Sequence, residues 1–281
     1  MSTVRHDPPH RPRGPSERAG TARSKVISVI VPAKNEAASL PQLVQEIVRT
    51  LRPLQEGEEL DDFEVLIVDD GSTDATPAVL RRLAASYPEL RPIRLAANVG
   101  QSAATAAGLR AARGDWIATL DADLQNDPAD LARLWEALPG HDAALGWRVT
   151  RRDVWSRRLI SRWANRVRNR VLGQAIRDTG CSVRIFPRDL ALRLPMFRGV
   201  HRFLGPLLLR ERCRIVQVPV NHRPRAHGRS HYNLRNRSIR VVVDLLGVAW
   251  LLRRPIHYQV IEDQTMASAA FGERSHAWRE G

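Results

Sequence analysis

The sequence predicts an α/β protein with a mostly parallel central sheet flanked by helices. Two observations support this fold class. Short β-branched runs recur along residues 26–147, and segments with apolar residues at helical spacing separate them. Such alternation is typical of βαβ units, whose strands pair in parallel and whose helices cover the sheet. The length of 281 residues suits one large domain with attachments.

Five strands and four helices are expected in the first half of the chain. The strands are short, strongly apolar runs, at 26–31, 63–68, 91–96, 115–120 and 141–147. The helices have apolar residues three and four positions apart, at 37–51, 74–87, 100–112 and 128–138. Thr73 or Asp74 is the expected N-cap of the second helix, because both side chains can accept from free backbone N–H groups.

The second half of the chain has a different pattern. It predicts a long arginine-studded helix at 154–172, strands at 181–186 and 214–220, a basic loop at 222–237 and an apolar helix at 239–252. The expected organisation is a disordered basic tail (1–25), a globular domain (26–237, with halves 26–147 and 148–237), an amphipathic helix (238–258) and a flexible tail (259–281).

The charge is divided unevenly along the chain. The total is +14, but residues 26–147 carry −9 and residues 148–240 carry +20. A basic half of this strength indicates an anionic partner, which can be phosphate, nucleic acid or a membrane face. The apolar run at 241–252 is too short to cross a bilayer, and no apolar leader opens the chain, so we expect a cytoplasmic protein.

Polar side chains follow three of the expected strands at the points where those strands end. Ligands of open parallel sheets bind beyond the carboxyl ends of the strands, so these side chains should converge on one edge. They are Pro32, Ala33, Asn35 and Glu36 after the first strand, Asp69 and Asp70 after the second, and Asp121, Asp123 and Gln125 after the fourth. Gathered carboxylates repel, so they need a cation or hydrogen-bond donors to offset the cost.

Asp121 and Asp123 form the sharpest local motif. Alternate residues at a strand end can reach a shared site, and two carboxylates are hard oxygen ligands. Such ligands suit Mg²⁺ or Mn²⁺, which would complete its coordination shell with water and phosphate oxygens. The motif therefore predicts a divalent metal site.

Several ordered motifs resemble glycosyltransferase family 2, and within it the polyprenyl-phosphate (dolichyl-phosphate mannose synthase-like) glycosyltransferases. The resemblance covers residues 26–252. It is carried by VIVPAKNEAASL, VLIVDDGSTDAT, NVGQSAATAAGLRAARGDWIATLDADLQNDP and DTGCSVRIF. It implies a GT-A fold, a nucleotide-diphosphate sugar donor and Mg²⁺ or Mn²⁺.

The resemblance also implies roles for individual residues. Asp69 or Asp70 would hold the base, and Asp123 would be the main metal ligand, aided by Asp121 and Gln125. The residues implied at the nucleotide are Pro32, Ala33, Asn35, Glu36, Asp69, Asp70, Gly100, Gln101 and Asp121. Ala33 stands where the family often has an aromatic side chain.

A second set of residues is implied for the acceptor phosphate. Arginine forks suit phosphate oxygens, and Arg148 and Arg157 are the implied catalytic pair beside Asp123. Arg157 and Ser161 lie one helical turn apart in the sequence. The implied acceptor residues are Arg148, Arg157, Ser161, Arg184, Arg225, Gly228, Ser230 and His231. His231 stands where the family commonly has lysine.

The expected reaction is inverting sugar transfer to a polyprenyl (undecaprenyl or dolichyl) phosphate at the cytoplasmic face of the cell membrane, in cell-envelope glycan synthesis. A phosphate monoester is largely dianionic at pH 7, so it needs no general base. The expected partners are the nucleotide sugar, the lipid phosphate and an anionic membrane surface bound peripherally, with no nucleic acid. Protein partners stay open between a homo-oligomer and a separate membrane protein.

Two other functions compete with this expectation. A family 2 enzyme could act on a lipid or polysaccharide hydroxyl, which needs a base, and Asp178 is the nearest candidate. The sequence pI of about 11.2 would suit a nucleic-acid binder, although the basic half lacks interleaved aromatic residues.

The helix at 239–252 has two interpretations: it lies in the lipid interface with Trp250 at headgroup level, or it packs on protein. Cys181 and Cys213 are expected to be buried, reduced packing residues.

Overall fold

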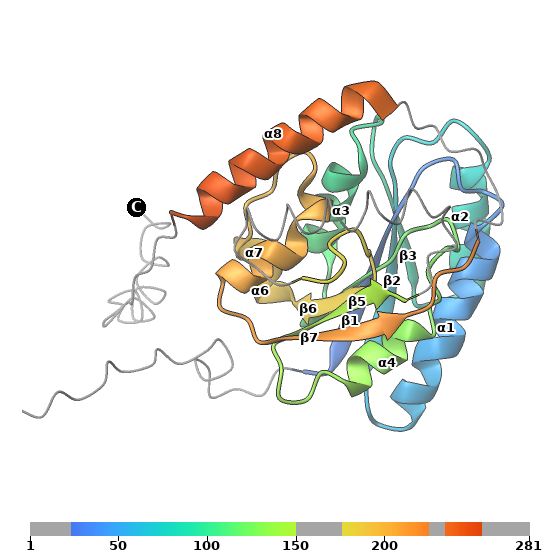
Figure 1. Cartoon of the computed structure of the whole chain (residues 1–281). Coiled ribbons are helices and arrows are strands. Elements are labelled where there is room, and N and C mark those ends of the chain that lie inside the picture. The colour runs from blue at the N-terminus through green and yellow to red at the C-terminus, as the bar shows by residue number, and fades with distance from the viewer. Residues whose placement is uncertain (1–23, 150–175, 225–233, 255–281) are drawn as a thin grey trace, which may run out of the picture.

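The computed structural model describes residues 24–149, 176–224 and 234–254, with side chains in the last range from residue 243 (Figure 1). Its strands are β1 (Val26–Ala33), β2 (Asp62–Asp69), β3 (Leu90–Arg94), β4 (Trp116–Thr119), β5 (Ala143–Arg148), β6 (Arg184–Pro187) and β7 (Ile215–Val220). Its helices are α1 (Leu40–Glu56), α2 (Thr76–Ser86), α3 (Gln101–Ala111), α4 (Asp130–Glu136), α6 (Arg188–Arg193), α7 (Leu204–Arg210), α8 (Leu234–Leu252) and the 3₁₀ turn η2 (Val200–Arg202). The expected helix at 154–172 lies outside the described residues.

The seven strands form one sheet in the order β3-β2-β1-β4-β6-β5-β7. All neighbours pair in parallel except β6, which runs antiparallel to β4 and β5. The α/β class and the mostly parallel sheet are therefore confirmed. The strand expected at 181–186 begins only at Arg184, and Ser182 bonds to the end of β4 and to the loop that follows β4. The carbonyl of Ser182 accepts from the Thr119 hydroxyl, and its own hydroxyl donates to Asp121.

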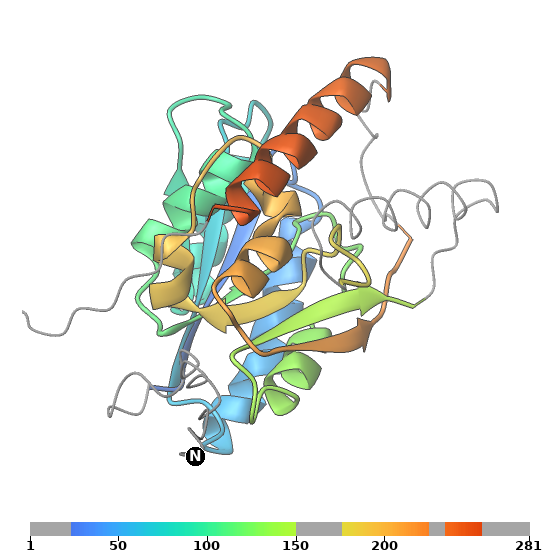
Figure 2. The same ribbon diagram turned by 60° about the vertical axis from the view of Figure 1, so that its left-hand side comes forward.

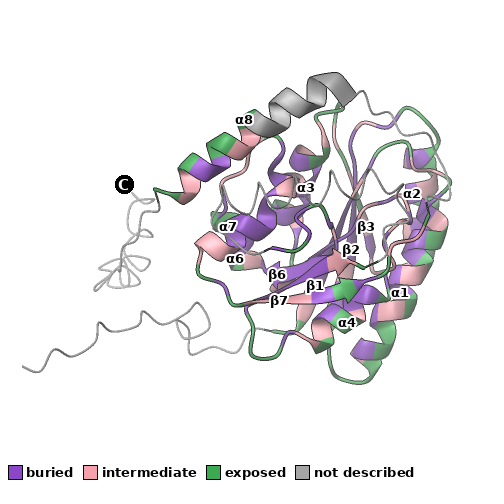
Figure 3. Ribbon diagram, in the orientation of Figure 1, coloured by how far each residue is buried: buried purple, intermediate pink, exposed green. Residues whose placement is uncertain are grey.

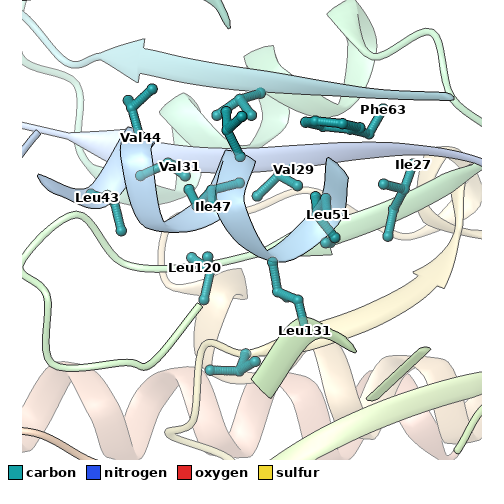
Figure 4. Close-up of a cluster of buried hydrophobic side chains, with 14 of the residues drawn as sticks. Ile27, Val29, Val31, Leu43, Val44, Ile47, Leu51, Phe63, Leu120 and Leu131 are labelled. Atoms are coloured by element: carbon teal, nitrogen blue, oxygen red, sulfur yellow. The ribbon is translucent and has the colours of Figure 1, made fainter. Parts of the chain in front are cut away.

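Helices cover both faces of the sheet (Figures 1 and 2). On one face, α1 presents Leu43, Ile47 and Leu51 at helical spacing to the alternate β1 residues Ile27 and Val29, and all five are fully buried (Figure 4). This match between a helical period and a strand period of two is why the sequence pattern located both elements.

The other face of the sheet carries α3, α6 and α7, which bury residues such as Leu109, Phe186 and Leu207. Gly108 brings α3 close to β1, since a Cβ atom at this position would come within 2.5 Å of Ile30 Cγ2. Close packing here sets the amino end of α3 at the carboxyl edge of the sheet, beside the loop that follows β4.

Helix α8 crosses the outside of the molecule above α7 and α3 (Figures 1 and 2). It begins at residue 234 instead of the expected 239, and Val248 and Ala249 pack against Phe203. From residue 243 onward its outward side is exposed, while the central strands are buried (Figure 3). Within the described residues, no helix combines the length and apolar character needed to cross a membrane.

Both cysteines are buried and free, as expected. Burial raises the pKa of Cys181 to about 11 and that of Cys213 to about 12. Thiols with such pKa values stay protonated at neutral pH and are poor nucleophiles. They therefore pack as small apolar side chains.

Candidate active site

The loops after β1 and β2 are joined by hydrogen bonds. The backbone N–H of Asn35 donates to Ser72 Oγ at 2.9 Å, and Asn35 Oδ1 accepts from the Thr73 N–H at 2.9 Å. The N–H of Glu36 donates to Thr76 Oγ1 at 2.9 Å. These bonds hold Asn35 in the left-handed region, at φ +54°. The residues implied for the nucleotide from the two strands therefore lie side by side, as the edge rule predicts.

Asp69 and Asp70 are both buried, and both shape loops. Asp69 Oδ1 accepts from the Ser72 N–H at 2.9 Å. Asp70 accepts from the N–H groups of Val99 and Gly100 at 2.8 and 2.9 Å, which brings the start of α3 to the end of β2. Gly100 has φ +99°, a conformation that glycine adopts without strain. The assignment of the nucleotide base to Asp69 or Asp70 stays a prediction.

A cavity of about 400 Å³ opens at the carboxyl edge of the sheet. It is lined by Pro32, Gln101, Thr105, Thr119, Leu120, Asp121, Asp123, Gln125, Arg148, Gly180, Ser182, Arg184, His201, Arg202 and Leu204. The cavity thus combines the Asp121–Asp123 motif with two of the implied acceptor arginines. The implied residues Ala33, Asn35, Glu36, Asp69, Asp70 and Gly100 lie outside its lining.

Asp121 is held by two neutral donors. Its Oδ1 accepts from Gln101 Nε2 at 2.9 Å, and its Oδ2 accepts from Ser182 Oγ at 2.7 Å. Loss of hydration in the cavity raises the pKa of Asp121; the Ser182 hydrogen bond opposes this shift. The nearby charge of Asp123 also raises it. A carboxylate in this state favours the arrival of a cation.

Asp123 and Gln125 follow Asp121 around a tight loop. Leu124 between them has φ +60°, and Asp123 Oδ1 accepts from the Gln125 N–H at 3.2 Å. Within residues 24–149 and 176–224, no cluster of three histidine, cysteine, aspartate or glutamate side chains is placed to hold an ion. Two carboxylates and one carboxamide in a shared cavity nevertheless fit Mg²⁺ or Mn²⁺, since these ions keep water and phosphate oxygens as further ligands.

Arg148, at the end of β5, forms a two-pronged ion pair with Asp178. Its Nε lies 2.7 Å from Asp178 Oδ2, and its Nη2 lies 3.0 Å from Oδ1. Burial pulls the pKa of Arg148 down, but the hydrogen bond and charge of Asp178 raise it above its usual range. Gly180 leaves room for the guanidinium, because a Cβ there would lie 3.1 Å from Nη2. Both carboxylate oxygens of Asp178, the candidate base, accept hydrogen bonds from Arg148. This pairing argues against a role of Asp178 as the base that takes a proton from an acceptor hydroxyl.

Arg184 is a second cation of the cavity, at the start of β6. Its side chain is buried, and Nη2 donates to the carbonyl of Thr179 at 3.2 Å. Burial lowers the pKa of Arg184, while the negative charges of Asp121 and Asp178 act in the opposite direction. The expected convergence of Asp121, Arg148 and Arg184 is therefore observed.

No sequence pattern predicted Ser182, His201 or Arg202 in the cavity. His201 and Arg202 belong to η2, which reaches the edge only because the chain returns there after α6. The one available signal in the sequence was the polar pair His201 and Arg202 directly before the buried run at 203–208. Six implied acceptor residues lie outside the described residues: Arg157, Ser161, Arg225, Gly228, Ser230 and His231.

Comparisons with known proteins agree with this geometry. Residues 28–194 match the sequence profile described as Glycosyl transferase family 2. The dodecaprenyl-phosphate galacturonate synthase of Rhizobium johnstonii is 35% identical over 245 residues, which are 84% of this chain and 71% of that protein. The undecaprenyl-phosphate 4-deoxy-4-formamido-L-arabinose transferase of Aeromonas hydrophila is 33% identical over 88% of this chain and 74% of its own.

Solved structures show the same fold. Glucosyl-3-phosphoglycerate synthase from Mycobacterium tuberculosis, in complex with Mg²⁺ and uridine diphosphate, has a TM-score of 0.59 at 23% identity over 81% of this chain and 80% of its own. A mannosyltransferase from Pyrobaculum calidifontis, in complex with GDP-mannose and Mn²⁺, has a TM-score of 0.57 at 22% identity over 85% and 67%. The architecture is thus GT-A-like, and the chain belongs to glycosyltransferase family 2 and is a glycosyltransferase.

Proposed function

We propose that this protein transfers a sugar from a nucleotide-diphosphate sugar to a polyprenyl phosphate, with inversion and with Mg²⁺ or Mn²⁺, at the cytoplasmic face of a membrane. One observation carries the proposal: a single cavity joins Asp121 and Asp123 to Arg148 and Arg184. An acidic side suits a metal-bound diphosphate, and a basic side suits a second phosphate. The names of the two curated relatives support a polyprenyl-phosphate acceptor.

The acidic side of the cavity would manage the leaving diphosphate. Asp123, with Asp121 and Gln125, would hold the metal, and that ion supplies charge stabilisation to the departing group. Gln101 and Ser182 keep both oxygens of Asp121 oriented, as their hydrogen bonds show. Such preorganised polar groups lose little energy to rearrangement during the reaction.

The basic side would place the attacking phosphate. A phosphate monoester is largely dianionic at pH 7, so it can attack the anomeric carbon without a base, and direct attack inverts configuration. Arg148, oriented by Asp178, offers its guanidinium to the phosphate oxygens. Arg157, Ser161, Arg225, Ser230 and His231 are proposed from the sequence to complete this side.

A thermal-shift screen followed by a product assay tests this function. A nucleotide sugar with Mn²⁺ or Mg²⁺ should raise the melting temperature, because a ligand at 100 times its Kd stabilises the folded state by about 2.7 kcal/mol. The metal alone or the sugar nucleotide with EDTA should give a smaller shift. The preferred donor should then label undecaprenyl phosphate and not diacylglycerol. Labelling of diacylglycerol instead would favour the hydroxyl-acceptor alternative.

We further propose that the outward side of α8 lies in the lipid interface. Val243, Leu246 and Trp250 share this side at helical spacing and are 60–61% exposed. The guanidinium carbon of Arg254 lies 5.3 Å from the Trp250 ring centroid, and Arg253 is exposed beside it. Aromatic and arginine side chains at one end of an apolar face suit the headgroup region of an anionic membrane.

A vesicle-binding measurement tests the α8 proposal. Replacing Leu246 by aspartate should reduce co-sedimentation with phosphatidylglycerol vesicles roughly tenfold, because it removes apolar contact and adds a repelled charge. High salt should release part of the wild-type protein. Leu192→Asp is the matched control, since Leu192 is also an exposed leucine but lies on α6. Equal losses for both variants would contradict a specific role for α8.

A further inference from the structure

One wall of the cavity has no role in the proposed reaction. It is formed by α3, η2 and the start of α7, which contribute Thr105, His201, Arg202 and Leu204. The acidic residues Asp121 and Asp123 come instead from the loop after β4, and the arginines of the basic side come from β5 and β6. Apart from Gln101, which holds Asp121, this α3–η2 wall has no assigned role at either phosphate.

His201 is fixed on this wall by Ser102. The Ser102 Oγ atom lies 2.8 Å from His201 Nδ1 and also accepts the backbone N–H of Gly199 at 2.9 Å. Ser102 is buried at the start of α3, next to Gln101, whose side chain holds Asp121. The imidazole is thus tied to the same helix end that orients the Asp121–Asp123 motif.

The two contacts of Ser102 set the hydrogen bonds that the imidazole can make on this side of its ring. A hydroxyl has one proton to donate, and here its oxygen already accepts from the Gly199 N–H. Donation of the hydroxyl proton to Nδ1 makes that nitrogen an acceptor, and the proton of neutral imidazole then resides on Nε2. A serine oxygen has two acceptor lone pairs, so Ser102 can also accept from an Nδ1–H. In the arrangement in which Ser102 donates to Nδ1, the Nε2–H lies at the end of the ring away from Ser102.

The reaction geometry defines what this wall faces. In direct displacement, the leaving diphosphate and the attacking phosphate lie on opposite sides of the anomeric carbon. Side chains that contact neither phosphate then lie beside the sugar ring between them. Sugar hydroxyl, carboxylate and amide substituents all accept hydrogen bonds. An N–H donor at this place can therefore bind one of them and select for sugars that carry it.

We propose that His201 is a specificity-determining residue for the transferred sugar. Its Nε2–H donates to an oxygen substituent on the sugar ring of the nucleotide-sugar donor, and Ser102 is the positioning residue that holds this tautomer. Arg202, also in the wall, favours substituents that accept strongly. The inference rests on the proposed function for its donor class, and it does not depend on the identity of the acceptor.

Calorimetric titration without acceptor tests the inference. The probes are UDP, UDP-glucose, UDP-galacturonate, GDP and GDP-mannose, each with Mn²⁺. His201→Asn keeps an atom near the Nδ1 position and loses the one near Nε2, whereas His201→Gln reaches the Nε2 position. We expect His201→Asn to raise the Kd of the preferred sugar nucleotide about tenfold, the equivalent of one hydrogen bond, with the Kd of the bare diphosphate within twofold of wild type.

The remaining variants separate binding from structure. His201→Gln should stay within about threefold of wild type, and Ser102→Ala should give an intermediate loss because the tautomer is no longer held. His141→Gln is the matched control, since His141 is exposed and bonds only locally to Pro139 among the contacts described for it. Melting temperatures are recorded for every variant to confirm that each one folds.

The outcomes separate this inference from the proposed function. Two results would overturn the role of His201 alone. One is an equal rise in Kd for the sugar nucleotide and the bare diphosphate in His201→Asn. The other is a Kd for the sugar nucleotide that is as high in His201→Gln as in His201→Asn. Wild-type protein that binds none of the sugar nucleotides would overturn both the proposed function and the inference. Selective loss in His201→Asn with recovery in His201→Gln supports the inference.

Discussion

Replacing Asp123 by asparagine should reduce sugar transfer by roughly 10³-fold. A bound metal contributes several kcal/mol to stabilising a leaving diphosphate, and each 1.36 kcal/mol is a factor of ten in rate. The variant keeps the shape of the side chain and an acceptor for the Gln125 N–H, so the fold should remain. The measurement is transfer of labelled sugar to undecaprenyl phosphate at saturating Mn²⁺, together with Mn²⁺ binding in the presence of the diphosphate.

The neighbouring carboxylates provide controls for this result. Asp127→Asn removes a charge from the same loop, but Asp127 pairs with Arg223 and does not line the cavity, so activity should stay within about threefold. Asp121→Asn should lower activity and also melting temperature, because its amide would meet the donors Gln101 and Ser182. Full activity in Asp123→Asn, or equal losses in Asp123→Asn and Asp127→Asn, would contradict the metal assignment.

The acidic part of the site was predictable because a topological rule fixes it. Parallel strands end at the same edge, so Asp121 and Asp123 were expected to lie near Pro32, which follows the first expected strand. All three residues line one cavity, in agreement with this expectation. The same rule does not apply to residues that follow helices, and it therefore did not predict the position of His201.

The hydrophobic periodicity of the sequence did not predict the direction of β6, which runs antiparallel to its neighbours. An apolar run predicts a strand but not its direction, which depends on how the chain returns from the preceding segment. The direction matters, since it puts Arg184 at the start of β6 beside the end of β4 and turns Ser182 toward Asp121. The ends of β4 and β5 both border the cavity, so side chains from the acidic half and from the basic half of the sequence meet there.

Arg148→Lys should impair use of the lipid phosphate far more than binding of the donor. Lysine keeps the positive charge but lacks the planar fork that now meets both oxygens of Asp178. We expect KM for polyprenyl phosphate to rise and kcat/KM to fall about 10²-fold, since charge-assisted hydrogen bonds contribute about 1.5–3 kcal/mol each. The Kd of the sugar nucleotide should change less than threefold.

Lysine is preferable to alanine at this position for a physical reason. Asp178 is 7% exposed, so truncating Arg148 would remove an ion-pair partner from a buried carboxylate and cost about 3–5 kcal/mol of stability. The matched control is Arg214→Lys, because Arg214 forms a similar pair with the buried Asp142. That pair precedes β7 and β5, at the edge of the sheet opposite the cavity, and so its loss should leave transfer unchanged.

Two further substitutions test whether orientation of Arg148, beyond its charge, is what matters. Asp178→Asn removes the charge that aligns the guanidinium, and Gly180→Ala puts a methyl group 3.1 Å from the present position of Nη2. Each should raise KM for polyprenyl phosphate about tenfold at nearly constant donor Kd, although neither removes a cation. If both variants have the wild-type KM for polyprenyl phosphate while Arg148→Lys is impaired, the orientation that Asp178 gives to Arg148 does not contribute to acceptor binding. If Arg148→Lys instead weakens the donor and spares the acceptor, Arg148 faces the nucleotide and the two sides of the cavity must be exchanged.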